Sequence, residues 1–581
     1  MLNECMSIFE TYAGADVDKL ILDNYIPANG FYLILEETET GFREKEQYEV
    51  MLDKKTRELN ITFAERVYIS RLDYHSSLVD MNKPVDSKKI IQSNNYLSFW
   101  IKQESLSNGK LNSEIIDGYY EVLADPYMKY SKGRNKELYQ MVEEEVGPVN
   151  QEKLMKAKQW VKENIFQLPY ELSGKDYLKI FFLCDGVSIE QEGKRYLLPN
   201  LFNKNDYNIR VDGDIYGLPN ENMGLNSKKP YLENKNRKYT VPMLLRTKDS
   251  IQRKKFFDYL WGLASKGYYN IYFDSRGKIV PLESKAAPRE ALTGYFLRIR
   301  KDKNEAAILD MDTVNFYQPE LKNPFWFDNI LDLDTKKLEG HRYGKYNYLY
   351  DICDIVNTEI FSNFLLGNLY NDPGDISCNN DGVIKENILI ARNRLFNWFF
   401  KGYTNDLAEL MEKVSVNMIQ NTISNGYMEK VQHQFNAYVS VLEYLKGGKV
   451  KMADIMEEVR GSIRDKINQR AHIQAKSDEE YYYAAGQLIR YFISLNKSQN
   501  KMHSLFNPFL TIKKDELLKL RLEDLFKKYN YGIDVTSPRF NNIYTMITHY
   551  IPKGSINHTF LIAGYISNNL IYEKKEENDN E

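Results

Sequence analysis

Carboxylates and a lysine that could support metal-dependent hydrolysis stand close together near the middle of the chain. Asp274 ends a short apolar run, and a turn over residues 275–278 leads to Glu283 and Lys285 on the next predicted strand. In many nucleases, carboxylates on neighbouring strands hold Mg²⁺ and a lysine helps to position the attacking water. The pattern predicts a metal-dependent nuclease as one function, although an ordinary charged hairpin has the same composition.

Basic residues interleaved with asparagine and tyrosine give a second signal, in residues 83–96, 228–238 and 253–255. Lysine and arginine neutralise phosphates, asparagine reaches base edges and tyrosine stacks on bases. We therefore expect a nucleic-acid interface, whereas a solvated loop is the alternative at each place. The predicted DNA-binding residues are Lys88, Lys89, Asn94, Asn95, Lys228, Lys229, Lys235, Arg237, Lys238, Arg253 and Lys254.

Other chemical signatures are missing from the sequence. There is no Gly-x-x-x-x-Gly-Lys-Ser/Thr phosphate loop, and the seven histidines form no His-Glu-x-x-His motif. The four cysteines lie far apart, which argues against a structural zinc site and a disulfide scaffold and suits a reducing cytoplasm. We expect no cofactor and no metal.

The charge of the chain is unevenly distributed, although its net value is only −3. Residues 151–300 carry an excess of ten positive charges, while residues 1–150 and 301–387 carry net charges of −9 and −8. Binding a polyanion needs a local positive potential and not a positive total. The distribution is therefore compatible with a nucleic-acid partner.

The elements that would position these residues fall into two parts. Before residue 340 the pattern mixes strands with helices over 152–166 and 250–266, and residues 199–240 have the composition of a long irregular loop. The predicted strands are Phe31–Glu37, Tyr96–Lys102, Leu178–Leu183, Asn270–Asp274 and Tyr295–Lys301. In the second of these, alternation places Trp100 and Lys102 on a polar face.

Beyond residue 380 nearly every segment has helical periodicity. The predicted helices cover residues 386–401, 405–424, 427–446, 450–475, 478–497, 513–529, 538–549 and 556–572. The fold class is therefore an α+β N-terminal body followed by an all-α helical bundle. We place the body at residues 1–380 and the bundle at 381–581, within the two or three domains that 581 residues predict.

Seven segments, in order through nearly the whole chain, resemble the large subunit of the type I-B CRISPR Cascade effector complex, the Csh-type family. They are Asp73–Lys102, Lys228–Pro242, Lys254–Asp274, Gly294–Lys301, Tyr481–Ser498, Phe506–Leu510 and Leu561–Lys574. The resemblance carries no catalytic signature and no short motif that defines the residues reading a protospacer-adjacent motif (PAM).

The resemblance implies a non-catalytic role in antiviral defence. Such a subunit lies at the 5′ end of the crRNA beside the Cascade backbone subunits, helps to recognise the PAM on double-stranded DNA, supports strand opening and helps to recruit the helicase–nuclease. Its C-terminal helical region resembles the small subunit, which some members also make from an internal start; Met411, Met418 and Met428 are conceivable starts here.

Three functions follow as hypotheses. In the first, the α+β body contacts duplex DNA and the helical bundle lines the path of the opened strands. The second is the nuclease, and the third is a structural subunit that touches only proteins. No segment has the ~20 uninterrupted apolar residues of a membrane helix, so we expect a cytoplasmic protein without a membrane partner.

Overall fold

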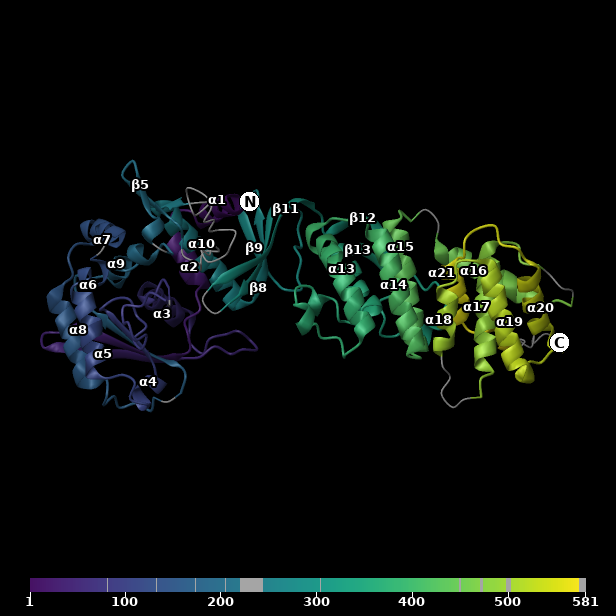
Figure 1. Cartoon of the computed structure of the whole chain (residues 1–581), viewed down its shortest axis with the longest axis horizontal. Helices are drawn as coiled ribbons and strands as arrows, with labels where there is room; N and C mark the ends of the chain where they lie inside the picture. Colours follow the sequence, from purple (N-terminus) through teal and green to yellow (C-terminus); the bar gives the residue numbers. More distant parts are fainter. Residues whose placement is uncertain are drawn as a thin grey trace. The chain divides into compact units, whose positions relative to one another are not determined.

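The computed structural model divides the chain into two compact units, which are described separately. Unit 1 comprises Met1–Ala286 and Thr293–Asn315, and unit 2 comprises Ala287–Leu292 and Phe316–Glu581 (Figure 1). The structure describes residues 1–80, 82–131, 133–172, 174–203, 205–219, 244–302, 305–448, 451–470, 474–497 and 503–573.

The first sheet of unit 1 has four strands in the order β2-β1-β4-β3. β1 pairs in parallel with β4 and antiparallel with β2, and β3 is antiparallel to β4. The strands are β1 (Gly30–Thr38), β2 (Gly41–Val50), β3 (Ser98–Lys102) and β4 (Tyr177–Leu183). Three of the predicted strands are thereby confirmed.

Helices cover this sheet and bury its apolar residues. They are α3 (Phe63–Ser76), α4 (Glu104–Ser107), α5 (Ser113–Ala124), α6 (Tyr127–Tyr130), α7 (Gly133–Val146), α8 (Gln151–Asn164) and α9 (Ile189–Arg195). At the start of α3, Thr62 and Glu65 form a reciprocal capping box, which satisfies two backbone N–H groups.

The predicted polar face of β3 is wrong, because Trp100 is buried in the core. The Nζ of Lys179, on β4, lies 3.7 Å from the centroid of the Trp100 ring. That ammonium is itself buried and pairs with the carboxylate of Asp73. A buried ion pair therefore covers the side of the sheet that the alternation assigned to solvent.

A second sheet of unit 1 has the strand order β11-β10-β8-β9, with helices packed against it. Its strands are β8 (Tyr268–Asp274), β9 (Lys278–Glu283), β10 (Leu292–Lys301) and β11 (Ala306–Tyr317), and its helices are α1 (Leu2–Ala13), α2 (Val17–Asn24) and α10 (Thr247–Lys266). The predicted helix over 250–266 and strands at 270–274 and 295–301 are confirmed.

The predicted irregular loop over 199–240 is partly wrong. Residues 205–219 contribute to a three-stranded sheet of β5 (Ile209–Val211), β6 (Asp214–Gly217) and β7 (Leu245–Arg246), preceded by the short helices η1 (Leu198–Asn200) and η2 (Asn205–Tyr207). Residues 220–243 lie outside the described part of the chain.

Unit 2 begins with β12 (Glu320–Phe327), α11 (Thr335–Leu338), β13 (Gly344–Tyr348), α12 (Leu349–Ile355) and a π-helical turn, η4 (Val356–Ile360). Short helices η5 (Leu366–Asn368) and η6 (Pro373–Asp375) follow. The two strands pair with each other, and both β12 and η4 pack against helix α15 (Met428–Leu445). Between residues 346 and 370, regular helix is therefore confined to α12, η4 and the short η5.

From Gly382 onward the described chain is helical, which confirms the expected α+β body followed by a run of helices. The helices are α13 (Gly382–Lys401), α14 (Leu407–Ser424), α15 (Met428–Leu445), α16 (Met452–Ile467), α17 (Asp478–Ser494), η7 (His503–Phe506), α18 (Asn507–Leu510), α19 (Asp515–Tyr529), η8 (Asn530–Gly532), α20 (Pro538–His549), α21 (His558–Ile566) and η9 (Leu570–Tyr572).

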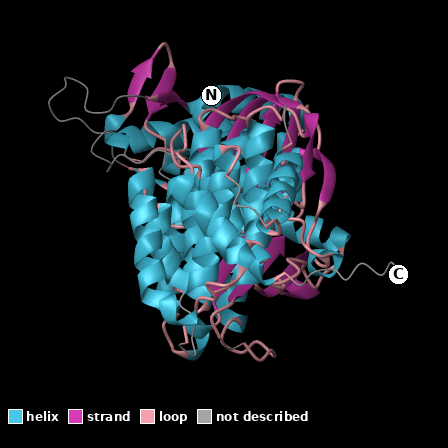
Figure 2. Cartoon of the chain, turned by 90° about the vertical axis from the view of Figure 1, so that its right-hand side faces the viewer, coloured by secondary structure: helices cyan, strands magenta, loops and turns pink. Residues whose placement is uncertain are grey.

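Local chemistry sets the ends of the first of these helices. The Asp381 side chain accepts from the backbone N–H groups of Val383 and Ile384, and Gly402 ends α13 in the left-handed region at a φ of 81°. Figure 2 shows the C-terminal helices packed side by side toward the viewer.

The change to helix near residue 380 is not where the compact units divide. Strands β12 and β13 belong with the helices that follow, because Phe325 and Phe327 of β12 are fully buried beside α15. The expected bodies of 1–380 and 381–581 thus follow secondary structure, whereas packing places the division near residue 316.

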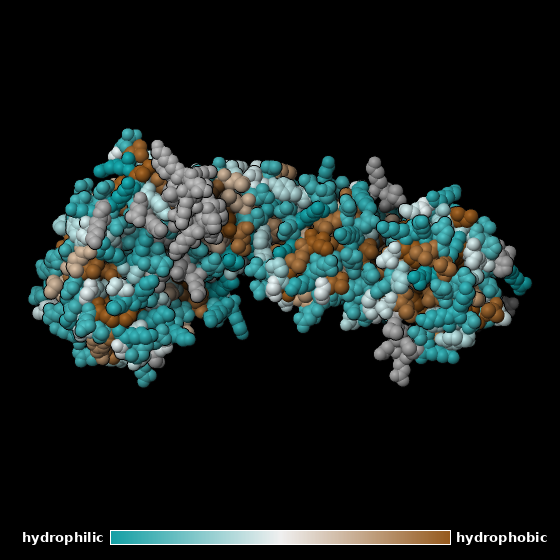
Figure 3. Space-filling view, viewed as in Figure 1, coloured by the Kyte–Doolittle hydropathy of each residue, from teal (hydrophilic) through white to brown (hydrophobic). Residues whose placement is uncertain are grey.

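The visible face of each unit is mainly hydrophilic, with apolar residues in small patches (Figure 3). Across the described residues, no helix combines the length and apolar character that spanning a membrane requires.

Candidate nucleic-acid interface

The predicted DNA-binding asparagines Asn94 and Asn95 are structural. Both are buried, and their side-chain amides donate to the backbone oxygens of Ser77 at 2.8 Å and of His75 at 3.4 Å. The Asn95 Oδ1 also accepts from the N–H of Leu97 at 2.9 Å. These contacts fix the segment that enters β3, so the prediction that the two amides face a nucleic acid is wrong for this structure.

The predicted surface cations of α10 also point into the fold. Arg253 is buried, with its guanidinium 5.9 Å from the ring centroid of Phe257. The Nζ of Lys254 lies 2.5 Å from the Asp258 carboxylate and 5.2 Å from the ring centroid of Tyr74. The sequence predicts these consecutive cations as one exposed group. In the structure, the side chains of Arg253 and Lys254 instead contact other residues of unit 1.

Lys88 and Lys89 are exposed, as a binding role requires. Their loop is shaped by the buried Asp86, whose carboxylate accepts from the backbone N–H groups of Lys88, Ile90 and Ile91 at 2.7 to 3.0 Å. Lys89 adopts a φ of 60°, which turns the chain sharply. In the described part of the chain neither lysine side chain has an ion-pair partner.

The remaining predicted cations, Lys228, Lys229, Lys235, Arg237 and Lys238, lie outside the described residues.

The three residues of the predicted nuclease site are not brought together. In the β8–β9 hairpin Asp274 pairs with Lys278, whereas Glu283 pairs with Tyr268 at the opposite end. About six residues of strand, roughly 20 Å, separate the two carboxylates. Asp274 is instead held by Arg276, whose hydrogen bonds keep the pKa of that carboxyl below its usual value.

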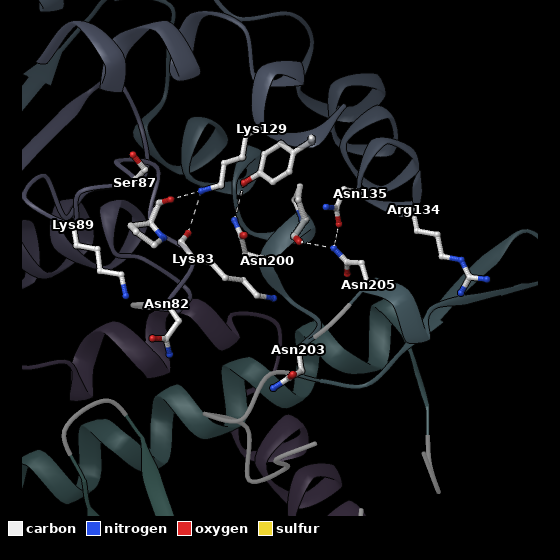
Figure 4. A pocket seen from close by; sticks show the side chains of 13 residues that line it. Asn82, Lys83, Ser87, Lys89, Lys129, Arg134, Asn135, Asn200, Asn203 and Asn205 are labelled. Carbon is white, nitrogen blue, oxygen red and sulfur yellow. Dashed lines mark hydrogen bonds between the residues drawn. The ribbon is translucent and has the colours of Figure 1, made fainter. Parts of the chain in front are cut away.

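Residues 83–89 form one wall of a cavity of about 890 Å³ in unit 1 (Figure 4). Helices α6 and α7 and the segment from η1 to η2 supply the other walls. The thirteen lining residues are Asn82, Lys83, Pro84, Ser87, Lys89, Lys129, Tyr130, Arg134, Asn135, Pro199, Asn200, Asn203 and Asn205. Among the described residues, the lining thus holds four cations, five asparagines and no carboxylate, a composition that favours an anionic ligand.

Two of the four cations hold the walls of this basic pocket. The Lys129 ammonium donates to the backbone oxygens of Lys83, at 3.3 Å, and Pro84, and the Lys83 ammonium donates to that of Phe202. Burial, with the charge of Lys83 adding, lowers the pKa of Lys129 to about 8, while the nearby Asp86 opposes the shift. An anion in the pocket would therefore stabilise the charged form of Lys129.

The other two cations are available to a ligand. Lys89 and Arg134 are exposed and stand on different walls (Figure 4). Within the described residues no carboxylate forms an ion pair with either side chain. A phosphate can therefore bind either side chain without breaking an ion pair within the described residues.

Hydrogen bonds between the walls keep the asparagines in place. The Asn200 amide donates to the Tyr130 hydroxyl at 2.9 Å and to the Tyr196 carbonyl at 2.7 Å. The Asn205 amide donates to the Asn135 side chain and, at 3.2 Å, to the Pro199 carbonyl. The asparagine-lined wall is therefore preorganised.

Sequence reasoning found Lys83, Lys89 and their loop but missed the opposite walls. Lys129, Arg134 and residues 200–205 are separated from the loop by about 40 to 120 positions, so no local window contains them. The one available signal was the run of four asparagines between residues 200 and 208, which the sequence reasoning assigned to an irregular loop.

No three histidine, cysteine, aspartate or glutamate side chains gather as a metal site in the part of the chain that the structure describes. Comparison of the chain with protein-family models, with curated proteins and with solved structures gives no match. The likeness to the CRISPR large subunit therefore remains a prediction from the quoted segments.

Proposed function

We propose that this chain binds nucleic acid through the basic pocket, as a non-catalytic DNA-binding subunit of a cytoplasmic CRISPR type I-B surveillance complex. The observation that carries the proposal is the composition of the pocket lining, which in the part of the chain that the structure describes has four cations, five asparagines and no carboxylate. Nucleic acids combine the two chemistries that this lining matches, phosphate oxygens and polar sugar or base edges.

In this proposal, Lys89 and Arg134 contact the phosphate backbone. Lys83 and Lys129 add positive potential while they hold the pocket walls, and the exposed Lys88 extends the field beside it. The exposed Asn82 contacts sugar or base edges, while Asn200 and Asn205, whose amide N–H groups are used between the walls, shape the pocket. Phosphate contacts of this kind set position and affinity and carry no sequence information by themselves.

The place of the subunit in a complex comes from the resemblance. Target specificity would come from pairing of the crRNA with DNA, while the protein reads only a short PAM and the backbone. The subunit would support strand opening beside the Cascade backbone and small subunits and help to recruit the helicase–nuclease. The alternative nuclease has less support, since Asp274 lies at the opposite end of its hairpin from Glu283.

The test of the pocket is a variant that removes its two available cations, Lys89→Ala with Arg134→Ala. Each phosphate contact contributes about 0.9 to the slope of log K against log salt concentration on duplex DNA. We expect weaker binding of target duplex and a slope smaller by roughly 1 to 2. The measurement is a gel-shift titration at several salt concentrations with the full chain.

Lys110→Ala with Lys175→Ala is the matched control, because both lysines are exposed in unit 1 and lie outside the pocket lining. An unchanged salt slope in the pocket variant, or an equal change in the control, would remove the pocket from the interface. Cleavage of DNA with Mg²⁺ that is lost on Asp274→Ala would instead favour the nuclease.

The family assignment has a separate test. Genes for Cascade backbone subunits and a helicase–nuclease should neighbour this one, and the chain should copurify with the backbone subunits. A complex that assembles through this chain but keeps its DNA affinity in the Lys89 and Arg134 variant would favour a purely structural subunit.

A further inference from the structure

An exposed tryptophan on the strand pair of unit 2 is placed to stack on a planar ligand. The Pro324-Phe-Trp-Phe segment of β12 buries Phe325 and Phe327 and leaves Trp326 with 43% of its surface exposed. The buried rings anchor the strand, since Phe325 lies 5.9 Å from the ring centroid of Tyr444 on α15 and Phe327 stacks on Tyr343 at 4.1 Å. The indole is thus presented on a fixed support.

Two lysines flank this indole. Lys345, its cross-strand partner on β13, has its Nζ 5.6 Å from the ring centroid, and Lys451, at the start of α16, has its Nζ 4.7 Å away. Both side chains are exposed, and no carboxylate of the described residues forms an ion pair with them. Asn347, two residues beyond Lys345, shares its face and is also exposed.

Carboxylates nearby offset part of this charge. Burial raises the pKa of Asp328 and of Glu443, and the charge of Lys451 opposes both shifts while Asp454 adds to them. Glu443 is also held by the backbone N–H of Met452. Asp328 follows β12, Glu443 lies on α15 and Asp454 on α16. None of these described carboxylates forms an ion pair with either lysine, so the exposed cations beside the indole still favour an anionic partner over an apolar protein surface.

We propose that Trp326 is a stacking platform for an unpaired nucleobase, with the flanking phosphates on Lys345 and Lys451 and the base edge within reach of Asn347. The proposal rests on the proposed nucleic-acid function and adds a site for single-stranded nucleic acid on unit 2. A ring that stacks and cations that neutralise the adjoining phosphates are what sequence-tolerant binding of single strands requires. A paired base cannot stack on the indole, because both of its faces are covered within the duplex.

The fluorescence of Trp326 provides a direct test. Of the five tryptophans, Trp100 and Trp398 are buried and Trp160 and Trp261 are partly buried, so Trp326 is the exposed one. Single-stranded oligothymidylate should quench the emission of the full chain. Subtraction of the emission of Trp326→Phe isolates the contribution of Trp326.

Affinity for oligothymidylate gives the second readout. We expect Trp326→Ala to weaken binding roughly 5- to 150-fold, the range that base–aromatic stacking gives, and Trp326→Phe to retain most of it. A strand of abasic sites of the same length should bind about as weakly to the native chain as oligothymidylate binds to Trp326→Ala. Lys345→Ala with Lys451→Ala should flatten the salt dependence, whereas the exposed Lys413→Ala on α14 should not.

The outcomes separate this inference from the proposed function. Duplex binding that depends on Lys89 and Arg134, with no quenching of Trp326, would overturn the platform alone. Equal affinity for abasic and base-bearing strands would also overturn it, since the contact would then be purely electrostatic. Failure to bind either duplex or single strands would overturn both proposals.

Discussion

At the scale of single residues, two stacked histidines of unit 2 are held in contrasting environments. The His433 ring, on α15, is buried and lies 3.5 Å from the ring centroid of His341. His433 Nδ1 hydrogen-bonds to the Tyr343 hydroxyl at 2.8 Å, and His341 Nδ1 to Glu359 at 3.0 Å. Burial, with the charges of His341 and Lys337 adding, lowers the pKa of His433 to about 4.

The lowered pKa of His433 predicts a loss of stability in acid. The unfolded chain takes up this proton near pH 6.5 and the folded chain only near pH 4, so the unfolded state binds more protons between these values. The free energy of unfolding therefore falls as the pH falls through this window, by about 2–3 kcal/mol from this group.

Urea unfolding of unit 2 at several pH values checks this prediction. His433→Gln should lessen the fall between pH 6.5 and pH 4, because the group that binds the proton is gone. His549→Gln is the control, since that histidine is exposed on α20. Equal pH dependence in the native chain and His433→Gln would contradict the assignment.

At the scale of elements, α17 and α21 pack through glycines. A Cβ built on Gly486 of α17 would lie 2.3 Å from the Leu561 carbonyl oxygen, and one on Gly564 of α21 would lie 2.1 Å from that of Tyr483. The Gln487 amide donates to the Gly564 carbonyl at 2.6 Å across this contact. The two backbones therefore meet at a distance that only glycine permits.

Alanine at either glycine should separate these helices. We expect Gly486→Ala or Gly564→Ala to lower the free energy of unfolding by about 1–3 kcal/mol, the range for overpacking. Gly461→Ala on α16 is the matched control, because its Cβ would meet open space and alanine favours a helix by up to about 1 kcal/mol. Thermal unfolding followed by circular dichroism measures all three. Stability of Gly486→Ala or Gly564→Ala equal to that of Gly461→Ala would contradict the close packing.

Several elements were predictable because their signals are local. The strands at 31–37, 178–183 and 270–274 and the helices from 386 onward follow from apolar periodicity and from glycine, proline and asparagine breaks. Burial of Asn94 and Arg253 was not predictable, since a polar residue reveals its partner only when distant backbone or aromatic groups are in place.

At the scale of the whole molecule, packing places the start of unit 2 near Phe316 and not at the change to helix near residue 380. Residues before the helices complete the core around α15. The Gln434 amide donates to the Ile360 carbonyl at 2.9 Å, and Asn436 Oδ1 accepts from the N–H of Leu331 at 3.2 Å. A fragment that begins at residue 382 would expose this side of α15.

Two fragments test the division. We expect residues 316–581 to unfold cooperatively, and residues 382–581 to lose several kcal/mol of stability and to aggregate because α15 loses its cover. Thermal unfolding and size-exclusion chromatography compare them. Equal stability of both fragments would mean that β12, β13 and η4 contribute little to the stability of the helices that follow them.

The sequence by itself determined the change from mixed strands and helices to helices alone near residue 380, the uneven charge and the presence of a basic loop at residues 83–89, because each depends on neighbours along the chain. Only the tertiary structure decided which polar groups face water, which walls oppose that loop and where Trp326 stands. Those outcomes depend on residues tens to hundreds of positions apart, and the free energy of burying or exposing a charge is set by whichever groups the fold brings beside it.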